Sequence, residues 1–198
     1  MLCIVAVCKA LASLNPVLPQ LILVTGPARS GKSEWAEYLA QQTLKQVVYV
    51  ATSTVSADDL EWQRRIEQHQ ERRPADWKTL ETPKNLARTI QSVDHNDCLL
   101  IDSVGTWLAN YLDEDDTSWR VIADGLVTAL KLSRCDVILV AEETGWGIVP
   151  AYPLGRTFRD RLGDLIRCIG AIATQAYLTT GGYALDLKRL GTLLPPKS

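Results

Sequence analysis

One eight-residue stretch constrains the fold of this chain more than any other: Gly-Pro-Ala-Arg-Ser-Gly-Lys-Ser, residues 26–33. It matches the pattern G-x-x-x-x-G-K-[ST], in which backbone N–H groups bind phosphates at the N-terminus of a helix. The apolar residues 21–24 before it predict a buried strand, and residues 33–40 after it predict an amphipathic helix. The motif requires this strand–loop–helix order, so we expect a nucleoside triphosphate site here.

Composition narrows the class of protein. The 198 residues suit a single α/β domain, and a formal net charge of −2 gives no electrostatic reason to expect nucleic acid as a partner. Five widely spaced cysteines without a C-x-x-C pair indicate reduced thiols, so we expect a cytoplasmic protein.

The first twenty residues differ from the rest of the chain. Residues 1–12 are apolar but too short to span a bilayer, and Pro16 and Pro19 then interrupt any regular element. We therefore expect no membrane anchor. Residues 1–20 are interpreted as an N-terminal extension outside the core, and residues 21–198 as the single domain.

Apolar runs that predict strands alternate with segments of helical spacing along the rest of the chain. The predicted strands are residues 46–52, 77–82, 98–102 and 136–140. The predicted helices are residues 57–73, 85–93, 103 onward, 118–132 with Ser118 as a candidate cap, and 155–173. Gly181 and Gly182 lie between residues 176–180 and 183–187 and predict a closing β-hairpin. This order predicts an α/β fold: a mostly parallel sheet with helices on both faces and an antiparallel C-terminal hairpin strand.

Carboxylates follow two of the predicted strands. Asp102 ends an apolar strand, where a parallel sheet presents its ligand site, and could hold Mg²⁺ directly or through water. The alternative is that Asp102 or Ser103 caps the next helix. Glu142 and Glu143 end the following strand, and the sequence leaves open which of them faces the cleft. Within the loop, Lys32 can reach the β- and γ-phosphates and Ser33 can offer its hydroxyl to Mg²⁺.

His69 lies in a highly charged segment that contains Arg64, Arg65, Arg72 and Arg73. One interpretation is an ordinary exposed histidine on a solvated helix. The other is a nucleophile, because neutral imidazole can form a covalent bond to phosphorus while arginines compensate phosphate charge. Arg156 and Arg159 are further candidates for phosphate contacts, or are surface residues.

Taken together, these motifs resemble one family, the bifunctional adenosylcobinamide kinase/adenosylcobinamide-phosphate guanylyltransferase of cobalamin biosynthesis. The similarity runs from about residue 21 to residue 187. The blocks that carry it are residues 25–33, 49–53, 65–77, 100–103 with Trp107 and Asn110, 143–150 and 158–163.

The resemblance implies a RecA-like P-loop fold and two reactions at one site. A nucleoside triphosphate, ATP or GTP, phosphorylates adenosylcobinamide. GMP is then transferred from GTP to adenosylcobinamide phosphate through a GMP–histidine intermediate, giving adenosylcobinamide-GDP. The resemblance also implies a homotrimer, and the phosphate loop with Asp102 predicts Mg²⁺ as a cofactor.

Site residues carry over position by position. The resemblance implies that His69 is guanylylated. The loop motif and the strand end predict Lys32 as the second catalytic residue and place Ser33 and Asp102 on the metal side. The positions implied to contact the nucleotide are Gly26, Pro27, Ala28, Arg29, Ser30, Gly31, Lys32, Ser33, Ala51, Thr52, Ser53, Gln70, Glu71, Arg72, Arg73, Glu81 and Asp102.

Three positions depart from the family pattern. Pro27 replaces a loop glycine and removes one N–H from the phosphate nest, Gly105 stands where threonine is common, and Ile166 replaces a frequent asparagine. Two alternative functions stay open: a kinase in which His69 is inert, and a nucleotide-dependent binding module. The sequence has no Asn-Lys-x-Asp guanine signature and so leaves the choice of base open.

Overall fold

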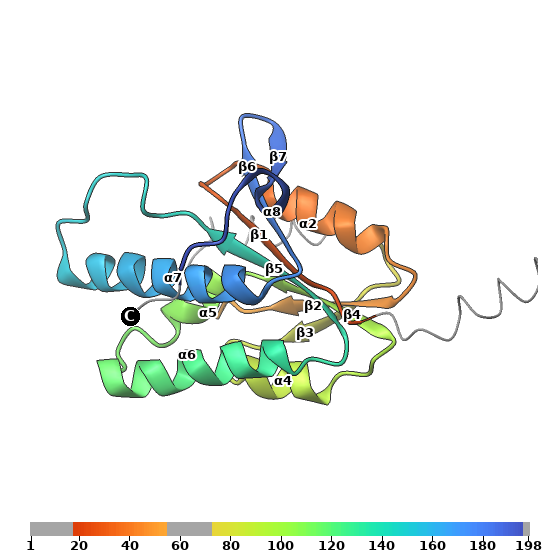
Figure 1. Ribbon diagram of the computed structural model, residues 1–198. Helices are drawn as coiled ribbons and strands as arrows, with labels where there is room; N and C mark the ends of the chain where they lie inside the picture. The colour runs from red at the N-terminus through yellow and green to blue at the C-terminus, as the bar shows by residue number, and fades with distance from the viewer. Residues whose placement is uncertain (1–17, 55–72, 196–198) are drawn as a thin grey trace, which may run out of the picture.

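The computed structural model describes residues 18–54 and 73–195. At its centre is a seven-stranded sheet of order β3-β2-β4-β5-β1-β6-β7 (Figure 1). The strands are β1 (Leu21–Gly26), β2 (Gln46–Ala51), β3 (Lys78–Glu81), β4 (Asp97–Asp102), β5 (Asp136–Glu142), β6 (Gln175–Thr180) and β7 (Tyr183–Asp186). Neighbouring strands are parallel except for the antiparallel pair β6–β7. The predicted fold class, including the antiparallel hairpin strand, is confirmed.

Helices cover both faces of the sheet, as Figure 1 shows. They are α2 (Lys32–Gln41), α4 (Leu86–Ser92), α5 (Val104–Ala109), α6 (Asp116–Lys131), α7 (Pro153–Ile172) and α8 (Leu187–Leu190). Helix α2 packs Ala36 and Ala40 against one face, whereas α4 to α7 bury a larger apolar cluster against the other.

Strand β4 shows why the buried strands read as continuous apolar runs. Cys98 and Leu100 point toward α2, and Leu99 and Ile101 point toward the opposite layer. Because successive side chains of a strand alternate between faces, a sheet covered on both sides needs apolar residues at every position. The alternation also puts Asp102 on the α2 face, two residues beyond Leu100.

The hairpin forms as predicted, and its turn explains the two glycines. Gly181 and Gly182 have φ angles of 58° and 82°, and a two-residue turn of type I′ requires positive φ at both central positions. Helix α8 follows directly and was not predicted. Asp186 caps it by accepting hydrogen bonds from the N–H groups of Lys188 and Arg189.

Two predicted helix starts were wrong by a few residues. Helix α6 is capped by Asp115, not Ser118: the Asp115 carboxylate accepts a hydrogen bond from the Ser118 N–H at 2.8 Å. Both residue types cap well, and the acidic run offered several candidates. Helix α7 begins at Pro153 rather than Gly155, since proline suits the first helical position, where no N–H is needed.

Some predictions fall outside the described part of the chain. Of the helix predicted for residues 57–73, only Arg73 is described, so His69 lies outside the described residues. Residues 1–17 of the predicted extension also lie outside them. Among the described residues, no helix is both long enough and apolar enough to cross a membrane.

Candidate nucleotide-binding site

The phosphate loop connects β1 to α2 at the carboxyl edge of the sheet. Gly26 ends β1, and Arg29 and Gly31 have positive φ angles of 58° and 89°, which turn the chain into α2. A Cβ on Gly26 would lie 2.5 Å from the Thr179 carbonyl oxygen of β6. Gly26 is therefore needed for close packing against the neighbouring strand.

Contacts within and around the loop hold its shape. The Lys32 ammonium donates to the Pro27 carbonyl oxygen at 3.1 Å, so Lys32 folds back over the loop. Ser30 Oγ lies 2.9 Å from Thr179 Oγ1, and the Glu143 N–H donates to the Gly26 carbonyl oxygen at 2.8 Å. Pro27 cannot donate an N–H but contributes its carbonyl oxygen to this arrangement.

Asp102 ends β4 beside this loop and is not the cap of α5. Ser103 is the N-cap, because its hydroxyl accepts a hydrogen bond from the Thr106 N–H. The Asp102 carboxylate instead accepts a hydrogen bond from the Tyr49 hydroxyl at 3.1 Å. Burial raises the pKa of Tyr49 well above its usual range, and the nearby Asp102 charge adds to the rise, so the phenol stays protonated and donates.

Glu142, rather than Glu143, has its carboxylate among the site residues. Ser103 Oγ donates to Glu142 Oε1, and the Gly105 N–H donates to Oε2 at 2.9 Å. Burial raises the pKa of Glu142; the Ser103 hydrogen bond and Lys32 oppose the rise, and Asp102 adds to it. A Cβ on Gly105 would lie 2.1 Å from Oε2, so the glycine at this position allows the contact.

A buried polar network ties the end of β2 to α5. The fully buried Thr52 hydroxyl donates to the Ser103 carbonyl oxygen at 2.7 Å and accepts from the Ser103 N–H at 2.9 Å. The Asn110 amide donates to the carbonyl oxygens of Thr52 and Pro83 at 3.0 and 2.9 Å. The Thr52 side chain thus fixes the backbone next to Asp102.

The structure brings most of the predicted residues to one edge of the sheet. Each of them ends a parallel strand or directly follows its carboxyl end: the loop 26–33 after β1, residues 51–53 after β2, Glu81 at the end of β3 and Asp102 at the end of β4. Arg73 joins them through its guanidinium, whose Cζ lies 3.3 Å from the centroid of the Tyr49 ring. The predicted residues His69, Gln70, Glu71 and Arg72 lie outside the described part of the chain.

Sequence reasoning assigned no role to Tyr49 or Thr179. A tyrosine inside a buried strand was a usable signal, because its hydroxyl needs a partner when buried. Thr179 gave no such signal, since its contact with the loop depends on β6 pairing with β1.

The remaining candidate arginines have internal partners. Arg156 donates to the carbonyl oxygens of Pro150 and Ala151 at 3.0 and 2.8 Å, which holds the end of the loop that leaves β5. Arg159 pairs with Asp160 at 2.8 Å. Ile166 packs against the apolar cluster beneath α7, so it serves the core.

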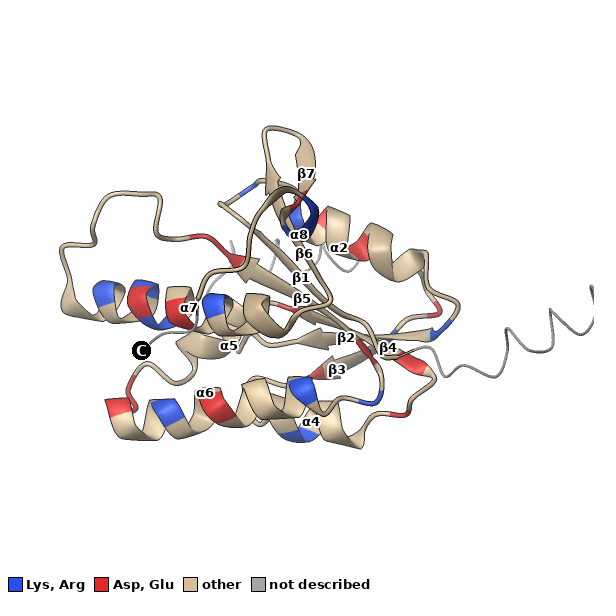
Figure 2. Cartoon of the chain, viewed as in Figure 1, with Lys and Arg blue, Asp and Glu red and all other residues tan. Residues whose placement is uncertain are grey.

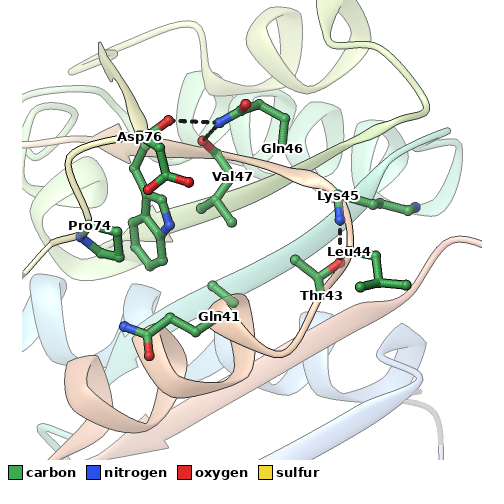
Figure 3. Close-up of a pocket in the computed structure, with 10 residues that line it drawn as sticks. Gln41, Thr43, Leu44, Lys45, Gln46, Val47, Pro74 and Asp76 are labelled. Atoms are coloured by element: carbon green, nitrogen blue, oxygen red, sulfur yellow. Dashed lines mark hydrogen bonds between the residues drawn. The ribbon is translucent and has the colours of Figure 1, made fainter.

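Two cavities lie away from this edge. One of about 370 Å³ lies between the end of α2 and the start of β2, where Gln46 donates to the Asp76 carbonyl oxygen at 2.9 Å (Figure 3). The other, of about 330 Å³, lies between α6 and α7. Acidic and basic residues alternate along those two helices, which therefore present no stripe of a single charge (Figure 2). Neither cavity includes a residue of the phosphate loop.

Comparison with known proteins identifies the family of this chain. The family model of cobinamide kinase / cobinamide phosphate guanyltransferase matches residues 22–187. The "Bifunctional adenosylcobalamin biosynthesis protein CobP" of Pseudomonas aeruginosa is 40% identical over 169 residues, covering 84% of this chain and 96% of that protein. The "Bifunctional adenosylcobalamin biosynthesis protein CobU" of Escherichia coli is 35% identical over 183 residues, covering 85% and 99%.

Solved structures share the fold at much lower identity. A Pyrococcus horikoshii OT3 protein matches with a TM-score of 0.53 and 7% identity over 90% of each chain. An ATPase of a bacterial type III secretion system matches with a TM-score of 0.53 and 11% identity, over 88% of this chain and 60% of that one. These two likenesses concern the fold alone. With its phosphate loop and its match to the family model over most of its length, the chain belongs to the cobinamide kinase / cobinamide phosphate guanyltransferase family.

Proposed function

We propose that this protein phosphorylates adenosylcobinamide with a nucleoside triphosphate and then transfers GMP from GTP to the product, giving adenosylcobinamide-GDP. The observation that carries the proposal is the family match over residues 22–187, which includes the loop bearing Lys32. Lys32, Asp102 and Glu142 lie close enough for both Lys32 and Asp102 to affect the pKa of Glu142. A lysine beside two carboxylates at strand ends suits a bound triphosphate and its cation.

In the kinase step, the loop N–H groups and the N-terminus of α2 bind the β- and γ-phosphates. The substrate hydroxyl attacks the γ-phosphorus and the bond to the β-phosphate oxygen breaks. Lys32 stabilises the negative charge that develops on the phosphoryl oxygens. The Pro27 carbonyl holds the Lys32 ammonium close to the loop until a phosphate replaces it.

Mg²⁺ fits the oxygen donors at this edge. Asp102 and the Ser33 hydroxyl would hold it. Among residues 18–54 and 73–195, no group of three His, Cys, Asp or Glu side chains could hold a metal ion without further ligands. Mg²⁺ ordinarily binds through one or two carboxylates together with substrate phosphates, so such a cluster is not required. When bound, the ion would neutralise phosphate charge.

In the guanylyltransferase step, His69 attacks the α-phosphorus of GTP and pyrophosphate leaves, forming a GMP–histidine phosphoramidate. The phosphate of adenosylcobinamide phosphate then attacks the same phosphorus and releases His69. Arg73 supports this role for His69. It follows His69 by four residues in the sequence, and its guanidinium contacts the ring of Tyr49, whose hydroxyl bonds Asp102. A guanidinium there suits phosphate binding.

The family resemblance also bears on where the protein acts, how it assembles and which nucleotide it uses. We propose that the protein acts in the cytoplasm as a homotrimer, that residues 1–20 lie outside the catalytic domain, and that either ATP or GTP serves the kinase step. The start of the family match at residue 22 supports the proposed boundary.

Labelling tests the proposal. Wild type incubated with GTP labelled on its α-phosphate should acquire acid-labile label, and His69→Ala should acquire none. Label transferred from the γ-phosphate to cobinamide measures the kinase step separately. Kinase activity without protein labelling would support a kinase with inert His69. Nucleotide binding or hydrolysis without either transfer would support a binding module instead.

A further inference from the structure

Tyr49 contacts two charged site residues at once. Its hydroxyl donates to Asp102 Oδ2 at 3.1 Å, and the Arg73 guanidinium carbon lies 3.3 Å from the centroid of its ring. Arg73 comes from the chain just before β3, and Asp102 ends β4, so one side chain of β2 bridges two segments. Tyr49 itself is only 4% exposed.

The sheet register explains how the hydroxyl reaches Asp102. Tyr49 pairs with Leu100, and Asp102 lies two residues further along β4 on the same face. Two residues of a strand span about 6.5 Å, which a tyrosine leaning along the strand can reach with its hydroxyl. A shorter polar residue at position 49 would not make this contact.

Arg73 is held by the ring on one side. Among the described residues, its buried Nε has no hydrogen-bond acceptor. An unpaired buried donor has a free-energy cost that a phosphate oxygen would remove. The ring face therefore holds the guanidinium in place while leaving a donor available.

We propose that Tyr49 is a positioning residue that fixes the Asp102 carboxylate through its hydroxyl and the Arg73 guanidinium through its ring. This inference rests on the nucleotide site of the proposed function. Asp102 serves the metal side of the nucleotide and Arg73 serves its phosphates directly. Loss of the Tyr49 hydroxyl should therefore affect the Mg²⁺-dependent part of nucleotide affinity, and loss of the ring should affect the Mg²⁺-independent part.

Binding of α,β-methylene-GTP, which cannot release pyrophosphate, tests the roles of the hydroxyl and of the ring without turnover. Affinity is measured by calorimetry with Mg²⁺ and with EDTA for wild type, Tyr49→Phe and Tyr49→Leu. Tyr177→Phe is the matched control, because its hydroxyl bonds Gln175 at 3.1 Å outside the site. Melting temperatures report whether each variant is folded.

Tyr49→Phe should reduce the gain in affinity from Mg²⁺ by about ten-fold, the lower end of what one hydrogen bond to a charged group contributes. It keeps the ring, so its affinity in EDTA should stay within about two-fold of wild type. Tyr49→Leu should also lose about five-fold in EDTA, because Arg73 loses its aromatic face. Tyr177→Phe should match wild type in both conditions.

Arg73→Lys provides a second measure if Tyr49→Leu does not fold. Lysine keeps the charge but lacks the planar group that stacks on the ring. It should lower affinity in EDTA at least as much as Tyr49→Leu, because it also removes the guanidinium donors, and adding Tyr49→Leu to Arg73→Lys should cause no further loss in EDTA, because the ring contact is already gone.

Two results would overturn the inference. One is a Tyr49→Phe protein in which Mg²⁺ increases nucleotide affinity as much as it does in Tyr177→Phe. The other is an equal loss of affinity with and without Mg²⁺, which indicates a general effect on the fold. Nucleotide binding without any transfer to cobinamide would instead contradict the proposed function and leave the role of Tyr49 standing.

Discussion

The backbone N–H of Gly105 donates a hydrogen bond to Glu142 Oε2 at 2.9 Å, which joins the first turn of α5 to the end of β5. The contact depends on the missing side chain of Gly105, since a Cβ there would lie 2.1 Å from the same oxygen. Glu142 is thereby held beside both Asp102 and Lys32.

Gly105→Ala should displace the Glu142 carboxylate. Overpacking of a buried position ordinarily costs about 1–3 kcal/mol of unfolding free energy, and we expect a loss in that range. Urea denaturation measures it. Gly125→Ala in α6 is the control, because nothing lies within 4 Å of a Cβ at that position, and alanine there should be neutral or slightly stabilising. Equal stability of Gly105→Ala and wild type would contradict the contact.

Glu142 should make stability depend on pH. Its pKa is raised in the folded protein, mainly by burial, so between the ordinary and the raised value the folded state binds more protons than the unfolded state. The free energy of unfolding should therefore fall as pH rises through this window. Glu142→Gln cannot titrate and should remove that part of the slope in EDTA-containing buffer. An unchanged slope in the variant would show that other groups cause it.

Gly26→Ala should distort the phosphate loop. Its Cβ would lie 2.5 Å from the Thr179 carbonyl oxygen and 2.6 Å from Ser30 Oγ, and the backbone oxygen cannot move without separating β1 from β6. We expect nucleotide affinity to fall by at least about ten-fold and stability by about 1–3 kcal/mol. Gly163→Ala in α7, where a Cβ has free space, should leave nucleotide affinity unchanged and stability unchanged or slightly higher.

Lys32→Met should remove most phosphoryl transfer. Losing one group that stabilises transition-state charge commonly costs about 10²–10³ in kcat, and we expect a loss of that size with γ-labelled nucleotide and cobinamide. Lys131→Met removes the same charge from the exposed end of α6 and should retain full activity. A Lys32→Met protein with near-normal kcat would exclude the proposed role.

Arg161→Met should destabilise the fold more than any single exposed arginine change. The buried Arg161 donates to the carbonyl oxygens of Tyr111 and Glu114 at 3.2 and 2.7 Å and pairs with Asp116 at 3.0 Å. Its removal takes one charged hydrogen bond from each of these acceptors, although the Tyr111 carbonyl oxygen still accepts from the Glu114 N–H, and we expect a loss of about 2–4 kcal/mol in urea denaturation. Arg167→Met loses only an exposed contact with Pro195 and serves as the control.

Local patterns were sufficient for much of the fold and part of the site. The phosphate loop, the end of β4 at Asp102 and the Gly181–Gly182 turn each depend on residues adjacent in sequence, and all three lie as predicted. The choice between Glu142 and Glu143 could not be made from sequence. Neighbouring strand residues point to opposite faces, and both are acidic at the end of an apolar run.

Contacts between distant segments explain the other gaps. The Tyr49–Asp102 bond requires the register of β2 against β4, which no local pattern specifies. Thr179 meets Ser30 only because β6 lies next to β1, although they are far apart in the chain. These pairings arise from tertiary packing, so a single sequence does not reveal them.

The contact of Gly26 and Ser30 with Thr179 has a consequence for biosynthesis. A ribosome makes the phosphate loop early and β6 late, and domains form their long-range contacts only when both partners have emerged. The loop therefore has no packing partner on its β6 side until Thr179, 149 residues beyond Ser30, has been made. The nucleotide site is therefore completed only after β6 has been made and has paired with β1.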